Sequence, residues 1–108
     1  MRTRETDITD IDLLVLSISL ETYIEDAHHF DSKDVYETNK PIATNCLNKV
    51  ENRVLKFSND EILVIHRALN LRKAKISFLT NRNDDAKKLE NLDIQSKSID
   101  LLLHAFDA

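Results

Sequence analysis

The 108-residue chain has no glycine and no tryptophan, and it has one proline and one cysteine. Glycine is the usual residue of tight hairpin turns and left-handed helix ends, so its absence argues against hairpin-rich and α/β folds. A glycine-rich phosphate loop is excluded outright. One cysteine allows neither an internal disulfide nor a cysteine metal cluster. These absences favour long helices joined by short polar links.

Aromatic residues and long apolar runs are also scarce. Aromatics make up 6% of the chain, which argues against nucleic-acid modules that stack bases on exposed rings. The longest apolar stretch, residues 11–20, is too short to span a bilayer and contains Asp12. Residues 1–7 are polar and charged, which is not typical of a signal peptide. We expect a cytoplasmic protein with no membrane partner.

The chain is rich in apolar residues at helical spacing. Apolar residues make up 42% and charged residues 31%, the proportions of a globular domain. We predict an all-α fold, an antiparallel bundle of about four helices in a single helical domain that covers residues 1–108. The predicted helices cover residues 7–29, 41–56, 59–79 and 84–106.

Local signals set the first two predicted helices. Thr6 suits the N-cap of the first. Residues 30–40 are polar and predict a connection, after which Pro41 suits the first position of the second helix. A continuous helix from residue 32 with Pro41 inside it is the alternative.

The clearest local signal is the capping box Ser58-Asn59-Asp60-Glu61. It predicts a sharp corner at Ser58 with almost no loop between the second and third helices. The link over residues 80–83 contains two asparagines, which are the second choice after glycine for a left-handed helix end.

The first helix carries an excess of apolar residues, in two stripes that wrap most of its surface. A helix that is apolar nearly all round is central in its fold or is covered by a second chain. We expect a homodimer that completes the bundle. Arg72 and Ser96 interrupt the stripes of the third and fourth helices, either to fix their register or because the stripe reaches solvent there.

Charge is segregated along the chain. The net charge is −6 over residues 1–40, +5 over 41–82 and −3 over 83–108. Two interpretations stay open: oppositely charged helices pair inside one bundle, or one face is a docking surface.

The leading functional hypothesis is a small non-enzymatic regulatory, adaptor or inhibitor protein that binds another protein through a helix face or an acidic surface. Charge complementarity of this kind speeds association and sets specificity. The candidate acidic surface comprises Glu21, Glu25, Asp26, Asp31, Asp34 and Glu37.

A dimeric nucleic-acid-binding protein is the alternative, because basic helices can follow a phosphate backbone. The net charge of −4 opposes it. The two hypotheses differ in whether the basic side chains form one exposed stripe or pair with acids of neighbouring helices. The candidate contacts are Lys49, Arg53, Arg67, Arg72, Lys73 and Lys75.

A metal-binding bundle is the second alternative. Glu25 and His28 have the Glu-x-x-His spacing of carboxylate metal bundles, but the chain has no second copy of this motif, so only a symmetric dimer would complete a site. Otherwise the two residues mark a solvated helix end. Cys46 fits a small core residue. We expect no catalysis and no cofactor, because no catalytic motif is present.

Overall fold

The computed structural model describes residues 8–106 and confirms the all-α fold. Throughout this part of the chain the regular structure is helical, with no strand. The helices are α1 (Asp10–Asp26), the short 3₁₀ turn η2 (Ala27–His29), α2 (Lys33–Glu51), α3 (Asn59–Asn81) and α4 (Ala86–Ala105).

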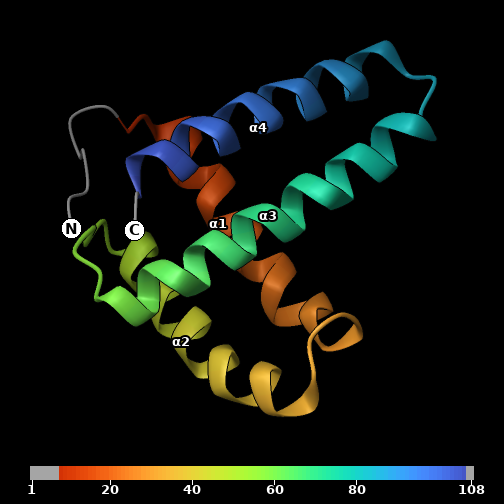
Figure 1. Cartoon of the computed structure of the whole chain (residues 1–108). Coiled ribbons are helices and arrows are strands. Elements are labelled where there is room, and N and C mark those ends of the chain that lie inside the picture. The colour runs from red at the N-terminus through yellow and green to blue at the C-terminus, as the bar shows by residue number, and fades with distance from the viewer. Residues whose placement is uncertain (1–7, 107–108) are drawn as a thin grey trace.

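Helices α1 and α3 hold the bundle together, because each packs against the other and against both α2 and α4. In Figure 1, α1 passes behind α3 and α4, which run antiparallel as a hairpin. At the right of this view the far end of that hairpin diverges from the junction between α1 and α2. The molecule is 22 Å thick, which corresponds to two layers of helices.

The core is centred on the crossing of α1 and α3. Leu16 and Leu20 of α1, together with Ile65 and Leu69 of α3, have no exposed surface. Three neighbours therefore cover one side of α1 within one chain, while Ile11 and Leu14 are 57% and 61% exposed. The other helices add Ala43, Cys46 and Val50 from α2, and Leu92, Ile99 and Leu102 from α4.

Helix α1 begins later than predicted. Its N-cap is Thr9, whose hydroxyl accepts from the Asp12 N–H (3.2 Å) while the Asp12 carboxylate accepts from the Thr9 N–H (3.0 Å). The proposed cap at Thr6 lies outside the described residues. At its other end α1 stops at Asp26 instead of residue 29, because the chain tightens into the 3₁₀ turn η2.

The predicted connection over residues 30–40 is wrong, and the alternative of one helix from residue 32 is right. Ser32 is the N-cap of α2, and its hydroxyl accepts from the Val35 N–H at 3.3 Å. The Tyr36 hydroxyl donates to the Ile24 carbonyl at 2.5 Å and fixes the new first turn on α1. Pro41 lies inside α2, where its side chain is exposed and it removes one backbone donor.

Helix α2 ends at Glu51 instead of residue 56. The prediction of almost no loop before the third helix is therefore wrong, because residues 52–57 form a link. The Arg53 N–H donates to the Val50 carbonyl (3.0 Å) and the Val54 N–H to the Lys49 carbonyl (2.8 Å). These two bonds make a Schellman motif. Arg53 occupies its left-handed position with φ 57°.

Arg53 is the one residue with positive φ in the described part of the chain. The asparagines of residues 80–83 therefore do not supply the left-handed helix end that we predicted. Helix α3 continues through Asn81, and its C-cap, Arg82, has φ −111°.

The capping box at the start of α3 is confirmed. The Ser58 hydroxyl accepts from the Glu61 N–H (3.2 Å), and the Glu61 carboxylate accepts from the Ser58 N–H (2.8 Å). Phe57, just before the cap, packs edge-on against Phe106 at 5.4 Å between ring centroids. The corner is therefore fixed by the end of α4 as well as by the cap.

In the region from residue 8 to residue 106, none of the helices combines the length and the apolar character needed to cross a bilayer.

Arg53→Gly should raise the free energy of unfolding by about 0.5–1 kcal/mol, because a left-handed residue with a Cβ is strained and glycine is not. Urea unfolding measures the change. Arg53→Val should destabilise the protein, since a β-branched residue tolerates positive φ poorly. Arg53→Lys is the control for the exposed ion pair with Asp10, which contributes little. A glycine variant less stable than the lysine variant would show that Arg53 is not strained.

Candidate functional site

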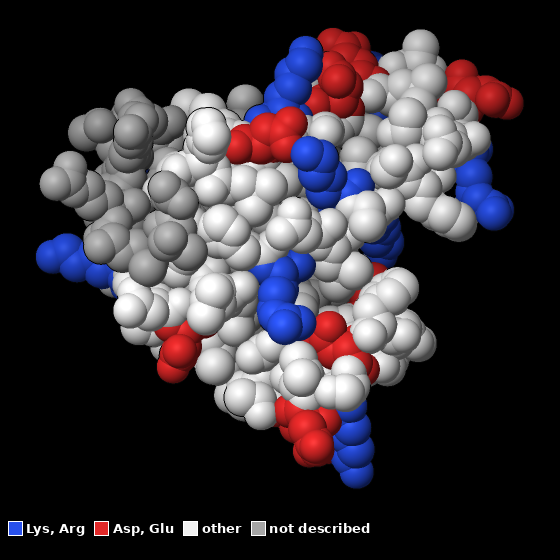
Figure 2. All heavy atoms as spheres, viewed as in Figure 1, with Lys and Arg blue, Asp and Glu red and all other residues white. Residues whose placement is uncertain are grey.

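The most distinctive surface feature is an apolar groove between the end of α1 and the second half of α3, which we call the α1–α3 groove. It has a volume of about 740 Å³. In Figure 2 the surface is hollowed at the right, between the far end of the α3–α4 hairpin and the end of α1. The lining consists of Thr22, Asp26, His29, Phe30, Asn70, Leu71, Ala74, Lys75 and Phe78.

Two aromatic side chains of the groove are unusually exposed. Phe30 is 73% exposed and Phe78 is 55% exposed. Isolated apolar residues are normal on a protein surface, but two phenylalanines at one apolar hollow are a feature of interaction sites. The Arg82 guanidinium lies over the Phe78 ring, 4.3 Å from the ring centroid, and Phe78 stays exposed beside it.

The charged groups of the groove neutralise each other. Lys75 Nζ and an Asp26 carboxylate oxygen are 2.8 Å apart, and the hydrogen bond from Lys75 lowers the pKa of Asp26 against a smaller opposing effect of burial. What remains for a ligand is mainly apolar surface.

Sequence reasoning missed this groove. Leu71 and Phe78 lie outside the heptad stripe assigned to the third helix, and they are seven residues apart, so they share one side of α3. This second stripe was the available signal. It becomes a groove only because α1 diverges from α3 at this end.

The structure divides the predicted acidic surface. Asp26 pairs with Lys75, and Asp31 accepts from the Tyr23 hydroxyl (2.6 Å) and lies 3.5 Å from Arg67. The other four are exposed: Glu37 faces Lys33 at 3.9 Å, whereas within residues 8–106 Glu21, Glu25 and Asp34 have no ion pair. Four of the six acids are therefore exposed, and the other two are held in contacts with other side chains of the chain.

The six predicted nucleic-acid contacts all have polar partners in the same chain, most of them acids, at 2.6–3.5 Å, and two of the pairs are exposed on the surface. Several of those acids belong to the acidic first part of the chain. This arrangement favours internal pairing over an exposed basic stripe. The contacts are Lys49 with Glu61, Arg53 with Asp10, Arg67 with Asp31, Arg72 with Gln95, Lys73 with Asp100, and Lys75 with Asp26.

Arg72 joins three helices from a partly buried position. Its guanidinium donates to the Gln95 side chain at 3.0 and 3.2 Å and to the Thr22 hydroxyl at 3.4 Å. These contacts match the register-fixing interpretation for Arg72. Ser96 is half-buried.

The candidate metal ligands Glu25 and His28 are both exposed, and η2 separates His28 from the α-helical register of Glu25. His28 stacks against His29 at 3.9 Å and lies edge-on to Tyr36. Across the described residues, no group of three potential ligands is placed to hold a metal ion.

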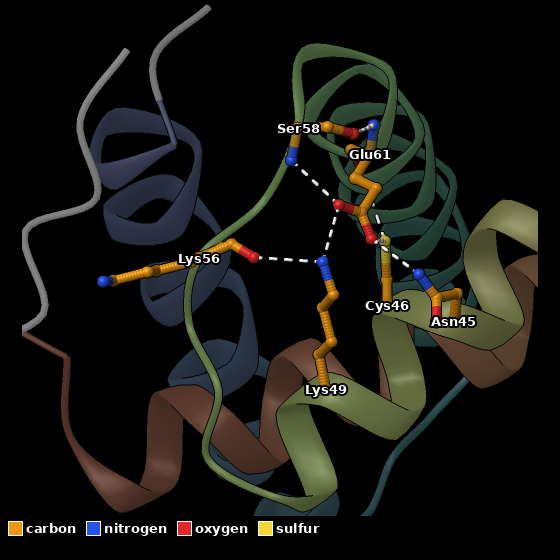
Figure 3. Close-up of polar contacts among 6 residues, drawn as sticks. All are labelled: Asn45, Cys46, Lys49, Lys56, Ser58 and Glu61. Carbon is orange, nitrogen blue, oxygen red and sulfur yellow. Dashed lines mark hydrogen bonds and ion pairs between the residues drawn. The ribbon is translucent and has the colours of Figure 1, made fainter.

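A buried polar cluster around Glu61 joins α2 to α3 (Figure 3). The Glu61 carboxylate accepts from Lys49 Nζ (2.8 Å) and from the Asn45 side-chain amide (3.0 Å), in addition to the Ser58 N–H. Burial raises the pKa of the Glu61 carboxyl, but the hydrogen bonds from Lys49 and Ser58 together outweigh burial and hold that pKa below its usual value.

Cys46 belongs to the same cluster. Its side chain has no exposed surface, and Sγ lies 3.9 Å from a Glu61 carboxylate oxygen. Burial, followed by the negative charge of Glu61, raises the pKa of the thiol to about 12. A thiol with this pKa is neutral at physiological pH and is not an activated nucleophile.

No protein-family model, curated protein or solved structure matches this chain.

Glu61→Gln should lower the free energy of unfolding at neutral pH by about 1.5–3 kcal/mol, the range for hydrogen bonds to a charged group. The folded-state pKa lies below the unfolded value of about 4.3, so the stabilisation is present above that value and is lost as the pH falls through the folded pKa. Urea unfolding of both proteins across this range measures the difference. Asp26, whose pKa is also lowered in the folded state, contributes equally to the wild-type protein and to Glu61→Gln. Equal slopes of the unfolding free energy against pH in the two proteins would therefore contradict a role for Glu61.

Cys46 should react with a disulfide reagent only after the protein opens. At about pH 8 a free thiol, with a pKa of about 8.5, is partly ionised to the reactive thiolate. The buried Cys46 thiol is neutral at this pH and inaccessible to the reagent. The rate of modification should therefore rise with urea in parallel with unfolding. The chain has one cysteine, so the released chromophore reports this site alone. Equal rates for folded and denatured protein would contradict the burial of Cys46.

Proposed function

We propose that this protein is a non-enzymatic adaptor or regulator that binds the apolar face of a helix from another protein in the α1–α3 groove. The single observation that carries this proposal is the pair of exposed aromatics, Phe30 and Phe78, on an apolar groove whose charged groups are already paired. Aromatic side chains at the centre of an apolar patch are the usual anchors of protein interfaces.

The chemistry of the lining favours a protein over a small molecule. A small-molecule site uses a few convergent polar groups to orient its ligand. In this groove the strongest polar groups, Asp26 and Lys75, bind each other. A helix needs no such groups, because its own backbone is satisfied and it presents an apolar stripe.

The net charge disfavours two other partners. A chain of net charge −4 is repelled by anionic membrane surfaces and by nucleic acid. The cations proposed for phosphate contacts are paired with other residues of the chain, most of them acids. Binding a phosphate backbone would require these pairs to break.

Photocrosslinking tests the proposal. A photoreactive phenylalanine analogue at position 78 or 30, expressed in the native cells, should give one adduct of discrete mass. The same analogue at Ile94, which is 46% exposed on α4 and outside the groove, is the matched control. Ala74→Arg should remove the adduct, because it fills the groove with an exposed charge on a helix that tolerates arginine.

Two outcomes would contradict the proposal. Equal adducts at positions 78 and 94 would mean that the groove is not selective. An adduct at twice 12.5 kDa alone would mean that a second copy of the chain is the occupant.

A further inference from the structure

A second hollow follows the α1–α3 groove along the same side of α3. It has a volume of about 470 Å³ and lies between α2 and the first half of α3, so we call it the α2–α3 hollow. Its apolar lining includes Leu63, which is 56% exposed, and Ile42. The complete lining is Asp34, Val35, Thr38, Asn39, Ile42, Asp60, Leu63, Val64 and Arg67.

The two hollows are aligned by the periodicity of α3. Leu63, Arg67, Ala74 and Phe78 follow one another at helical spacing and lie on one side of the helix. From Asp60 to Phe78 this side of α3 is about 27 Å long at 1.5 Å per residue. Arg67, which pairs with Asp31, belongs to the lining of the α2–α3 hollow and is the last residue of α3 in it before the groove begins at Asn70.

The α2–α3 hollow differs from the groove in its free charge. Asp34 and Asp60 are exposed in the first turns of α2 and α3, and neither has an ion pair within residues 8–106. The one cation in the lining, Arg67, faces Asp31 at 3.5 Å. This end of the surface is therefore acidic, whereas the α1–α3 groove is neutral.

We infer that the occupant is an amphipathic helix that lies along α3, with an apolar anchor in each hollow and a lysine or arginine opposite Asp34 and Asp60. This inference rests on the proposed function and adds the chemistry of the partner. The hollows are centred eight to eleven residues apart along α3, or roughly 12–16 Å. Residues three turns apart on a partner helix, eleven positions along its chain, lie on one face and have about this separation, so the anchors are eleven residues apart.

Selection from a displayed library of helical 18-residue peptides with one randomised face tests this inference. The enriched peptides should carry two large apolar residues eleven positions apart and a basic residue near one end. Fluorescence polarisation of one labelled enriched peptide then measures its affinity for each variant.

The double change Asp34→Asn and Asp60→Asn should lower the affinity for this peptide about 3- to 10-fold at low salt. The difference in affinity should become smaller as salt is added, because salt screens the charges. Asp84→Asn with Glu90→Gln is the matched control, since it removes two exposed acids away from both hollows. The control should leave the affinity unchanged. Circular dichroism checks that each variant stays folded.

The outcomes separate this inference from the proposed function. The inference would be overturned if the enriched peptides show no basic preference and bind equally well after the Asp34 and Asp60 changes. If Ala74→Arg still abolishes their binding, the groove remains a binding site. If the library yields no peptide whose binding Ala74→Arg abolishes, both the inference and the proposed function are overturned.

Discussion

The crossing of α1 with α3 is the contact on which the rest of the structure depends. Leu16 and Leu20 meet Ile65 and Leu69 without exposed surface, and α2 and α4 each pack against both helices. Burial of such side chains contributes roughly 1.5–3 kcal/mol each, so this seam dominates the stability of a small domain. Because the two helices cross instead of running side by side, they separate again beyond the seam, and the α1–α3 groove lies where they separate.

Two buried acids attach neighbouring helices to this seam in the same way. Asp12 and Glu61 each occupy the third position of a capping box. Each carboxylate also reaches another helix: Asp12 accepts from the Ser98 hydroxyl of α4 at 2.5 Å, and Glu61 accepts from Lys49 of α2. Each acid thus fixes the start of its own helix and the position of a second one. A buried carboxylate is tolerated here because every such group is hydrogen-bonded.

Polar groups are also paired with one another on the surface of the bundle. Cations of α2 and α3 are paired with acids from α1, from the following link and from α4, which accounts for much of the charge segregation along the chain. The side of α3 from Leu63 to Phe78 carries exposed apolar side chains between the paired cations Arg67 and Lys75. At one end lie the free carboxylates of Asp60 and, from α2, Asp34. A surface of this composition suits a helical partner better than a phosphate backbone or a small ligand.

The helical fold class, the approximate extents of α3 and α4, and the cap at Ser58 could all be predicted from the sequence, because periodicity and capping are local properties of the chain. Sequence reasoning misplaced the start of α2, since Pro41 is a strong local signal that the contacts of Ser32 and Tyr36 override. It placed the left-handed residue at asparagine, whereas Arg53 takes that conformation in the Schellman motif at the end of α2. Which charges pair and where a groove forms depend on how the helices pack against one another, including the angle at which α1 crosses α3, and no local pattern specifies that packing.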